Sequence, residues 1–450
     1  MNEAQLNQIV NTVLYEGYVL YPYRPSAKKN QRERFTFGRV YPPAYGAAQN
    51  GREPCVMQTE CLLQGNGEPA TLHIRVRFLH PMWREIGRLV TPAGKLATGT
   101  EPKFEVVPEL WLDGQLHQTW QEAREQEIQL PPVSVFAGHV ERHFSFPAAR
   151  SLTPLVDKSG RTVAVTVRRQ AALRGTVEVK LKKTAGNSFQ LTVRVQNLTP
   201  LTPGELQDSD AVLLRTFAST HVILHAPNAS FVSLLEPPAE FKALAAACKN
   251  IGAWPVLVGA PGDSKRDTML ASPIILYDYP QIAPESDGDY CDGTEMDEML
   301  ALRVLTMTDA EKKEMRLVDG VARRILERTE NMPPEHFWKL HGTLRDVRAA
   351  AEFFNPPQPV ARMVMVNGAQ VKVGDRVRLH PKKRADALDL ILAGKTAIIE
   401  AVEQDVENQI HLAVVLEEDP GRDLGLSRQP GHRFFYSTEE VEPLAKEEAR

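Results

Sequence analysis

Alternating apolar and polar positions are the clearest pattern in the first half of the chain. From about residue 52 to 200 the alternation has a period of two, as in segments 72–78, 177–182 and 189–195. One apolar face per strand is typical of an antiparallel sheet that is covered on one side. Two such faces can bury each other, so this region predicts a β-sandwich. Segment 81–160 departs from the alternation and predicts long loops.

The N-terminus predicts a short amphipathic helix followed by a basic and aromatic segment. In residues 3–15 the apolar positions Leu6, Ile9, Val10 and Leu14 share one helical face. Segment 24–41 then predicts strand structure around Phe35, Phe37, Val40 and Tyr41, and it carries Arg24, Lys28, Lys29, Arg32, Arg34 and Arg39. Basic and aromatic side chains together can bind single-stranded nucleic acid. Solvated charges at a strand edge explain the same residues, and the acidic chain as a whole favours that second explanation.

From residue 211 the pattern changes to short apolar runs alternating with helical periodicity. Strands are predicted at 221–225, 231–235, 255–259 and 273–279, with a helix over 238–249. A capping box at 308–311 opens a helical end that reaches to about residue 353. This composition predicts a central α/β region.

A proline-rich stretch at 355–359 precedes a run of short strands at the C-terminal end. Strands are predicted at 371–379, 396–402, 411–416 and 434–436, with Val441 closing. About 75 residues in short strands suggest a small SH3-like barrel, a fold that serves several kinds of binding.

The predicted fold class is therefore α+β and multidomain. It combines an N-terminal antiparallel β-sandwich-like region, a central α/β region with a helical end, and a C-terminal SH3-like β-barrel. The predicted divisions are 1–50 for the helix and the basic, aromatic segment, 51–205 for the sandwich, 206–354 for the α/β and helical domain with an acidic loop at 285–298, 355–369 for a linker, and 370–446 for the barrel.

Composition narrows the class of protein. The 450 residues, 42% hydrophobic and 24% charged, suit a soluble globular protein of about three domains. A formal net charge of −4 argues against bulk electrostatic binding to nucleic acid or to an anionic membrane. No apolar run reaches the roughly 18 residues of a membrane span, and the N-terminus lacks a secretory pattern. We expect a cytoplasmic protein without a membrane span.

The four cysteines predict reduced thiols. Cys55 and Cys61 lie in one predicted strand, where six extended residues span roughly 20 Å. Disulfide-bonded Cα atoms lie within about 7 Å of each other. A disulfide between them is therefore excluded within that strand.

The densest group of possible ligands lies in the acidic loop, where Asp287, Asp289, Cys291 and Asp292 follow a predicted strand. A mixed carboxylate and thiolate site suits a transition metal. An EF-hand is disfavoured because position six of its spacing is Asp292 rather than glycine. The alternative to a metal is structural, since Thr294 to Asp297 has capping-box spacing and first-turn carboxylates favour a helix N-terminus.

Two histidines are further candidate ligands for such a site. His221 and His225 lie on one face of a predicted strand and would have to reach the loop through the fold. Hydrogen-bonded, partly buried histidines are the more common explanation for that pattern. No resident cofactor is predicted beyond this possible transition metal.

Catalytic motifs are missing from the sequence. The chain contains no Gly-x-Ser-x-Gly elbow, no His-Glu-x-x-His motif and no Gly-x-x-x-x-Gly-Lys-Ser/Thr phosphate loop. This lowers the expectation of an enzyme without excluding one.

Two passages of the chain match a known pattern. They are CDGTEMDE at 291–298 running into LRVLTMT at 302–308, and, in the tail, VGDRV at 373–377, VVLEEDPGRD at 414–423 and GHRFF at 431–435. These segments resemble a family of uncharacterised bacterial proteins encoded beside [NiFe]-hydrogenase structural and maturation genes. The resemblance extends from about residue 210 onward. It implies a role in hydrogenase assembly and brings no catalytic residues with it. The chain lacks the paired Cys-x-x-Cys motifs of hydrogenase large subunits.

The leading functional hypothesis is a non-catalytic accessory or assembly protein that acts through protein–protein contacts. Its expected partners are hydrogenase subunits or maturation factors. One alternative is a metal-dependent enzyme with a carboxylate and thiolate site in loop 287–292. The other is a nucleic-acid-binding protein, which the net charge disfavours.

Overall fold

A computed structural model describes most of the chain, and the chain divides into two compact units. The described residues are 3–20, 23–32, 34–66, 70–93, 101–184, 186–259, 266–282, 288, 297–318, 320–333, 363–381, 392–404, 410–419 and 433–444. Residues 1–283, 288–293 and 310–325 form unit 1, and residues 284–287, 294–309 and 326–450 form unit 2.

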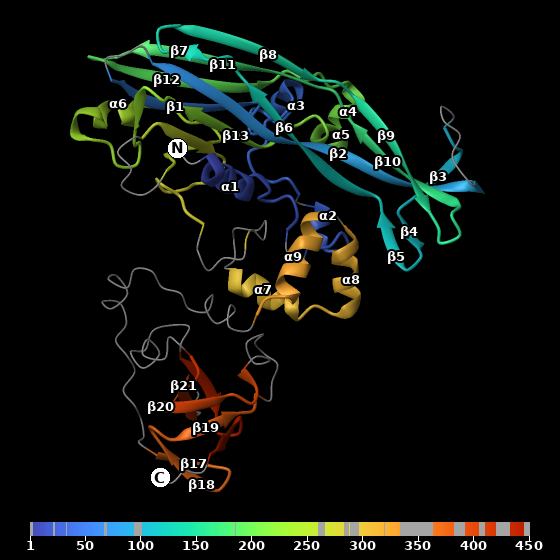
Figure 1. Ribbon diagram of the computed structural model, residues 1–450, viewed down its shortest axis with the longest axis vertical. Coiled ribbons are helices and arrows are strands. Elements are labelled where there is room, and N and C mark those ends of the chain that lie inside the picture. Colours follow the sequence, from blue (N-terminus) through green and yellow to red (C-terminus); the bar gives the residue numbers. More distant parts are fainter. Residues whose placement is uncertain are drawn as a thin grey trace. The chain divides into compact units, whose positions relative to one another are not determined.

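The first sheet of unit 1 has five antiparallel strands in the order β14-β1-β12-β11-β8 (Figure 1). The strands are β1 (Val56–Gly65), β8 (His139–Phe146), β11 (Leu173–Lys183), β12 (Ser188–Asn197) and β14 (Ala229–Val232). The predicted alternation sets its register, because Val177 pairs with Val195 and Val179 with Val193. All four of these valines are buried. The prediction of a one-sided apolar hairpin here is confirmed.

The second sheet of unit 1 has nine strands, six of them in the order β15-β16-β13-β2-β10-β9, with β3, β6 and β7 also paired to β2. Its strands are β2 (Thr71–Ala93), β3 (Phe104–Val107), β6 (Trp120–Gln129), β7 (Val133–Ser134), β9 (Ala149–Val156), β10 (Thr162–Gln170), β13 (Ala218–His225), β15 (Trp254–Leu257) and β16 (Thr268–Ser272). A separate hairpin joins β4 (Glu109–Leu112) to β5 (Gln115–Gln118).

Strand β2 organises the whole unit because of its length. Its 23 residues extend over roughly 75 Å at about 3.3 Å per residue. Along residues 75–79 both β13 and β6 pair with it, and along residues 86–88 both β10 and β3 do, so two partners occupy its two edges at each place. The second half of β2 thus leaves the sandwich and continues into a projection (Figure 1). We call this projection, made with β3, β4, β5, β9 and β10, the arm.

The two sheets face each other across one hydrophobic core. Inward side chains of β1, β11 and β12 meet those of β2, β13 and β16 in a single buried cluster. Helix α1 (Glu3–Leu14) covers the outer face of the nine-stranded sheet by packing Leu6, Ile9 and Val10 on Ile223 and Leu270. Helix α6 (Lys242–Ala247) packs against Leu62 of β1 on the outer side of the other sheet. The predicted β-sandwich and the predicted N-terminal helix are both present.

Shorter elements complete unit 1. They are α2 (Lys28–Arg32), α3 (Pro43–Ala48), α4 (Pro203–Leu206), α5 (Ser209–Leu213) and the 3-10 turn η1 (Ala239–Phe241). The strand expected around residues 35–41 is reduced to one isolated bridge between Val40 and Phe217.

The predicted boundary between residues 205 and 206 falls inside unit 1. Strands β13 and β14, from the region expected to be α/β, pair antiparallel with β2 and β1. The expectation of an α/β arrangement needs correction here, since β13 to β16 complete the two antiparallel sheets. Segment 273–279 is also not a strand, because β16 ends at Ser272 and the segment begins with Pro273 and is followed by Pro280.

Segment 81–160 consists largely of strands and not of the expected long loops. The alternation fails there because charged side chains lie on both faces of the sheet. Arg77 binds Glu125 at 2.9 Å, and Arg84 binds Glu122 at 2.8 Å across the β2–β6 pair. Cross-strand ion pairs thus take places that apolar residues hold elsewhere.

The C-terminal part of the chain begins with helices and continues as a small β module. The helices are α7 (Asp297–Leu305), α8 (Asp309–Val318) and α9 (Gly320–Glu330). The strands are β17 (Met363–Val366), β18 (Ala369–Lys372), β19 (Arg376–Leu379), β20 (Thr396–Gln404), β21 (Ile410–Leu416), β22 (Phe434–Ser437) and β23 (Val441–Pro443). Five of them form an antiparallel sheet in the order β22-β21-β20-β19-β23, and β17 pairs with β18.

The β module of unit 2 matches the predicted strands except in one place. The expected strand 371–379 is interrupted by a turn at Gly374, whose φ of +91° suits glycine. One core joins the module, including Val377, Ile399, Val414 and Tyr436. Closure of these strands into an SH3-like barrel stays a prediction.

A shielded ion cluster reinforces this β module. Arg433, only 9% exposed in its side chain, donates from Nε to Glu400 at 2.7 Å and from Nη2 to Glu403 at 2.6 Å. Both glutamates are similarly covered. The cation therefore balances two carboxylates that share one side of β20.

Candidate functional site

The acidic loop that the sequence predicts as a metal site lies almost wholly outside the described residues. Asp287, Asp289, Cys291 and Asp292 all belong to the undescribed part. Only Gly288 and the start of α7 are described within 285–298. The loop metal site therefore stays a prediction.

His221 is enclosed by hydrogen bonds on the outer face of β13. Its Nδ1 donates to the Ser219 carbonyl at 2.7 Å, which leaves Nε2, 3.3 Å from the Ser272 hydroxyl, to accept a hydrogen bond. The ring has no exposed surface, and this burial lowers the pKa of His221 to about 4. Both nitrogens are thus engaged in structure, and the ring is neutral near pH 7.

His225 also has partners of its own. Its Nδ1 lies 3.1 Å from the Asp267 carbonyl oxygen and 3.1 Å from the Thr268 hydroxyl, and the Asp267 carboxylate is 3.8 Å away. Across the described parts of the chain, no group of three or more His, Cys, Asp or Glu side chains is arranged to hold a metal ion. The three described cysteines, Cys55, Cys61 and Cys248, are free thiols.

Arg24 and Arg39 of the basic segment are engaged within unit 1. Arg24 forms an ion pair with Glu311 at 2.6 Å. Arg39 donates to the backbone carbonyls of Phe35 and Arg34. Arg24 thus ties the segment to α8, and Arg39 binds the segment's own backbone; both uses compete with phosphate binding. Lys28 and Lys29 are exposed.

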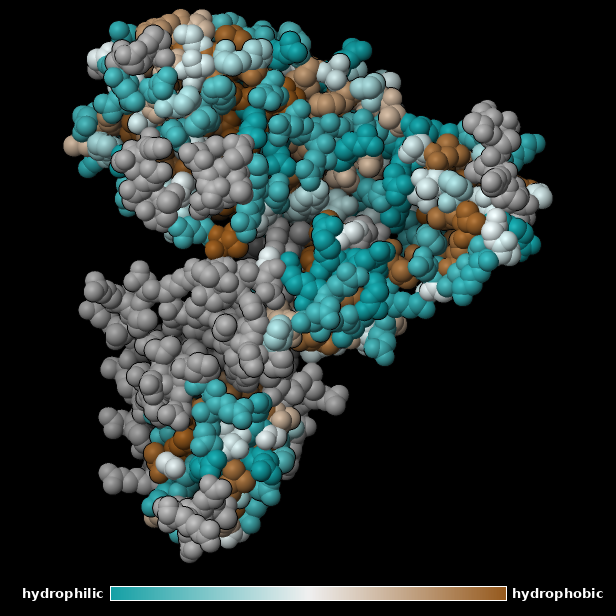
Figure 2. All heavy atoms as spheres, in the orientation of Figure 1, coloured by the Kyte–Doolittle hydropathy of each residue, from teal (hydrophilic) through white to brown (hydrophobic). Residues whose placement is uncertain are grey.

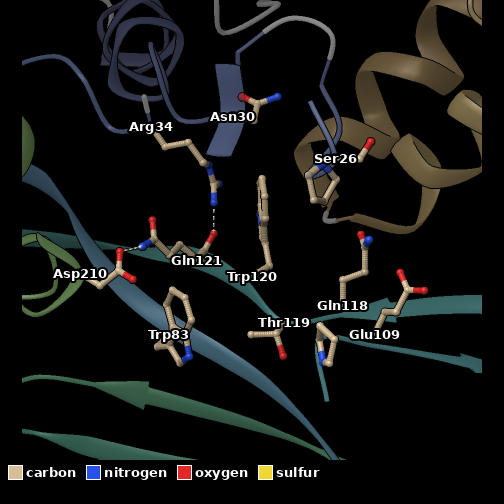
Figure 3. A pocket seen from close by; sticks show the side chains of 12 residues that line it. Ser26, Asn30, Arg34, Trp83, Glu109, Gln118, Thr119, Trp120, Gln121 and Asp210 are labelled. Atoms are coloured by element: carbon tan, nitrogen blue, oxygen red, sulfur yellow. Dashed lines mark hydrogen bonds between the residues drawn. The ribbon is translucent and has the colours of Figure 1, made fainter. Parts of the chain in front are cut away.

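A pocket of about 440 Å3 opens where this segment meets the base of the arm (Figure 3). Three parts of unit 1 form its walls: residues 25–34, the strands β2 and β6 with the β4–β5 hairpin, and helix α5. Its lining residues are Pro25, Ser26, Asn30, Arg34, Trp83, Pro108, Glu109, Gln118, Thr119, Trp120, Gln121 and Asp210. Its volume lies in the range of sites that hold small ligands or single side chains.

Arg34 and Trp120 form the fixed wall of the pocket. The Arg34 guanidinium lies 3.7 Å from the centre of the Trp120 ring. Its Nε donates to the Tyr18 carbonyl at 3.0 Å, and Nη1 donates to the Gln121 carbonyl at 2.5 Å. In Figure 3 the Trp120 ring stands between Arg34 on one side and Ser26 on the other. Arg34 is 5% exposed, so its positive charge interacts with the groups of the wall and is shielded from solvent.

Asp210 supplies a carboxylate on the Arg34 side of Trp120, next to Gln121 (Figure 3). It lies in the first turn of α5, and Gln121 donates to its Oδ1 at 2.8 Å. Partial burial, and then the nearby Asp208, raise the pKa of Asp210, whereas the Gln121 hydrogen bond lowers it. Glu109, on the β4–β5 hairpin, is a second carboxylate at the rim and is exposed. The pocket thus has a carboxylate on α5 and another on the β4–β5 hairpin.

No protein-family model matches the chain, and no curated protein matches it. None of the helices within the described residues is long and apolar enough to cross a membrane.

Sequence reasoning named Arg34 but missed the rest of this pocket. Trp83, Trp120 and Asp210 come from three distant segments, and each is unremarkable in its local pattern. The available signal was the pair of tryptophans in strands with charged neighbours. Such bulky rings among polar residues need a specific place in the fold.

Proposed function

We propose that the protein is a cytoplasmic, non-catalytic accessory protein that acts through protein–protein contacts. The observation that supports this most directly is the arm. It extends the nine-stranded sheet beyond the sandwich core, so its strands have one sheet layer where the sandwich has two.

Large apolar side chains stay at the surface of the arm. They are Val90 (71% exposed), Val106 (50%), Trp111 (53%) and Val156 (48%). Figure 2 shows hydrophobic side chains at the surface of this part of unit 1, over β3, β4, β5 and their neighbours. Exposed apolar groups gathered on a protein surface often mark sites of protein association. In the β2–β3 register Val106 shares a face with Gly87 and Leu89, whereas Val90 lies on the other face, so a partner that covers both valines would wrap around the edge of the arm.

The arm has its own rigidity, as a binding surface needs. Leu89, Val165 and Val167 are buried beneath Phe104 and Leu152 in a small cluster separate from the main core. A preorganised surface loses less conformational entropy when it binds. The arm is therefore suited to present a fixed shape to a partner.

The proposed partners are hydrogenase subunits or maturation factors, on the basis of the resemblance at 291–308 and in the tail. Unit 2 offers a second surface, since Met363 and Met365 on β17 are exposed. Methionine-rich surfaces adapt to varied partners. A small barrel of SH3-like type, if the strands of unit 2 close in that way, would fit the same role.

The two alternatives have less support. For nucleic acid, Arg24, Arg34 and Arg39 are already bound to groups within unit 1. For a metal-dependent enzyme, the hypothesis still depends on loop 287–292, and the surroundings of His221 and His225 add nothing to it.

The test is capture of a defined partner with surface variants. An arm variant carries Val90→Ser, Val106→Ser and Val156→Ser, and a control variant carries Leu198→Ser and Leu235→Ser, which are exposed apolar positions outside the arm. Each tagged chain is purified with a co-expressed hydrogenase large-subunit precursor or maturation protein. We expect recovery with the wild type and the control variant and its loss with the arm variant. Equal recovery with all three, or with none, would contradict the proposal.

A further inference from the structure

The pocket at the base of the arm has most of its polar groups already engaged. Asn30 binds the backbone of Leu20 through both its oxygen and its nitrogen. Ser26 donates to Glu314, and the Thr119 hydroxyl donates to the Val107 carbonyl. These contacts hold the walls in place and leave few hydrogen-bonding groups for a ligand. The groups free to act on one are the carboxylates of Asp210 and Glu109 and the faces of the tryptophans.

The charges of the pocket favour a cation. Among the described residues that line it, Arg34 is the single cationic one, and it is shielded, stacked on Trp120 and bonded to two carbonyls. An anion entering the pocket would meet two carboxylates before any exposed positive charge. A cation would meet those carboxylates first and the aromatic walls next. Both interactions are attractive for a positive charge.

The shape of the cation follows from the walls. Arg34 itself shows that a planar guanidinium stacks on a tryptophan in this place, at 3.7 Å. A second guanidinium could stack on Trp83, which lies beside Asp210 in Figure 3, while donating to the Asp210 carboxylate. Arginine combines this flat stacking surface with donors that match a carboxylate, and lysine lacks both features.

We propose that this pocket binds an arginine side chain that projects from a partner protein. The inference rests on the proposed function, which it deepens by assigning a charged anchor beside the apolar arm. Buried arginines that enter a pocket are frequent hot spots of protein interfaces. The apolar arm would supply contact area, and the pocket would fix the position of the partner along the arm.

The partial burial of Asp210 is consistent with this role. Its pKa is raised by that burial and then by the neighbouring Asp208 carboxylate. An incoming guanidinium would supply a counter-charge and lower the pKa of Asp210 again.

The experiment measures binding of N-acetyl-arginine-N-methylamide to the full chain. The neutral isostere N-acetyl-citrulline-N-methylamide serves as the matched ligand. The chain is labelled with 15N-tryptophan, and the Trp83 and Trp120 indole signals are assigned by Trp83→Phe and Trp120→Phe substitutions. We expect saturable shifts of these two signals with the arginine compound, and affinity about tenfold weaker or worse with the citrulline compound.

Variants separate a charge effect from a folding effect. Asp210→Asn and Glu109→Gln together should weaken arginine binding by about tenfold, whereas the distant exposed Glu240→Gln should leave it unchanged. The lysine analogue should bind more weakly than the arginine compound. Equal binding of arginine and citrulline compounds, shifts spread over all tryptophans, or full affinity in the double variant would each overturn the proposal.

The two proposals fail in different ways. Loss of partner capture in the arm variant with normal arginine binding supports both. Partner capture without any arginine binding by the wild type overturns the pocket and leaves the accessory function standing. Arginine binding without capture of any hydrogenase protein overturns the proposed function and keeps the recognition of arginine.

Discussion

Replacing Arg34 by lysine tests how the N-terminal segment is held to the second sheet. The substitution keeps the positive charge but removes the planar fork. In the native protein that fork donates to the carbonyls of Tyr18 and Gln121 and stacks on Trp120. A lysine ammonium can reach one of these partners and cannot stack as a plane.

The expected cost follows from these contacts. A hydrogen bond to a charged group contributes about 1.5–3 kcal/mol, and a desolvated cation–π contact contributes about 2 kcal/mol. Lysine should recover part of one hydrogen bond and part of the cation–π attraction. We therefore expect Arg34→Lys to lower the free energy of unfolding of unit 1 by about 2–3 kcal/mol.

Urea denaturation followed by tryptophan fluorescence measures this effect. The signal reports mainly on unit 1, because Trp83, Trp111, Trp120 and Trp254 lie there and one further tryptophan lies in unit 2. The matched control is Arg88→Lys, a substitution of the same chemistry in an exposed ion pair with Glu105. The control should change the free energy by less than about 0.5 kcal/mol.

A small effect would refute this account of Arg34. If Arg34→Lys and Arg88→Lys unfold at the same urea concentration, then the stacked, hydrogen-bonded guanidinium of Arg34 adds no stability beyond that of a flexible lysine cation. In that case the pocket wall would also not be rigid, and the recognition proposed for it would lose its basis.

Three further predictions concern other parts of the chain. Arg433→Met leaves two covered glutamates without their cation and should cost about 3 kcal/mol in urea denaturation, against less than about 1 kcal/mol for Arg376→Met at an exposed pair. The pKa of His221 is lowered to about 4 by burial, so the unfolded state binds the proton first as pH falls. Stability should then drop by up to about 3 kcal/mol between pH 6.5 and 4, with a flatter slope in His221→Asn. Gly87→Ala places a methyl group against the ring of Phe104 and should cost about 1–3 kcal/mol, seen as faster amide exchange in β3; unchanged exchange would exclude that collision.

Local pattern was enough to predict the strands of the sandwich and most strands of unit 2. Val177, Val179 and Leu181 alternate with charged residues, and the structure pairs them with the apolar positions of β12. The reason is that a one-sided sheet needs only a period of two, which any segment carries within itself. The same holds for α1, whose apolar stripe is complete in twelve residues.

Strand β6 escaped prediction because its stabilising contacts are not periodic in the sequence. In β6, glutamates and glutamines occupy both faces, and Glu122 and Glu125 pair with Arg84 and Arg77 of β2, about 40 residues earlier. The sequence of a strand that is charged on both faces cannot be distinguished from that of a loop unless its partner strand is known.

The sequence by itself determined the secondary structure of most segments and which residues make up the C-terminal β module. Only the tertiary structure decided that β13 to β16 complete the sheets begun by β1 and β2, and that Trp83, Trp120 and Asp210 share one pocket. The physical reason is the range of the information. An amphipathic period can be recognised within about ten consecutive residues. Strand pairing and pocket walls form only when segments more than 100 residues apart pack against each other.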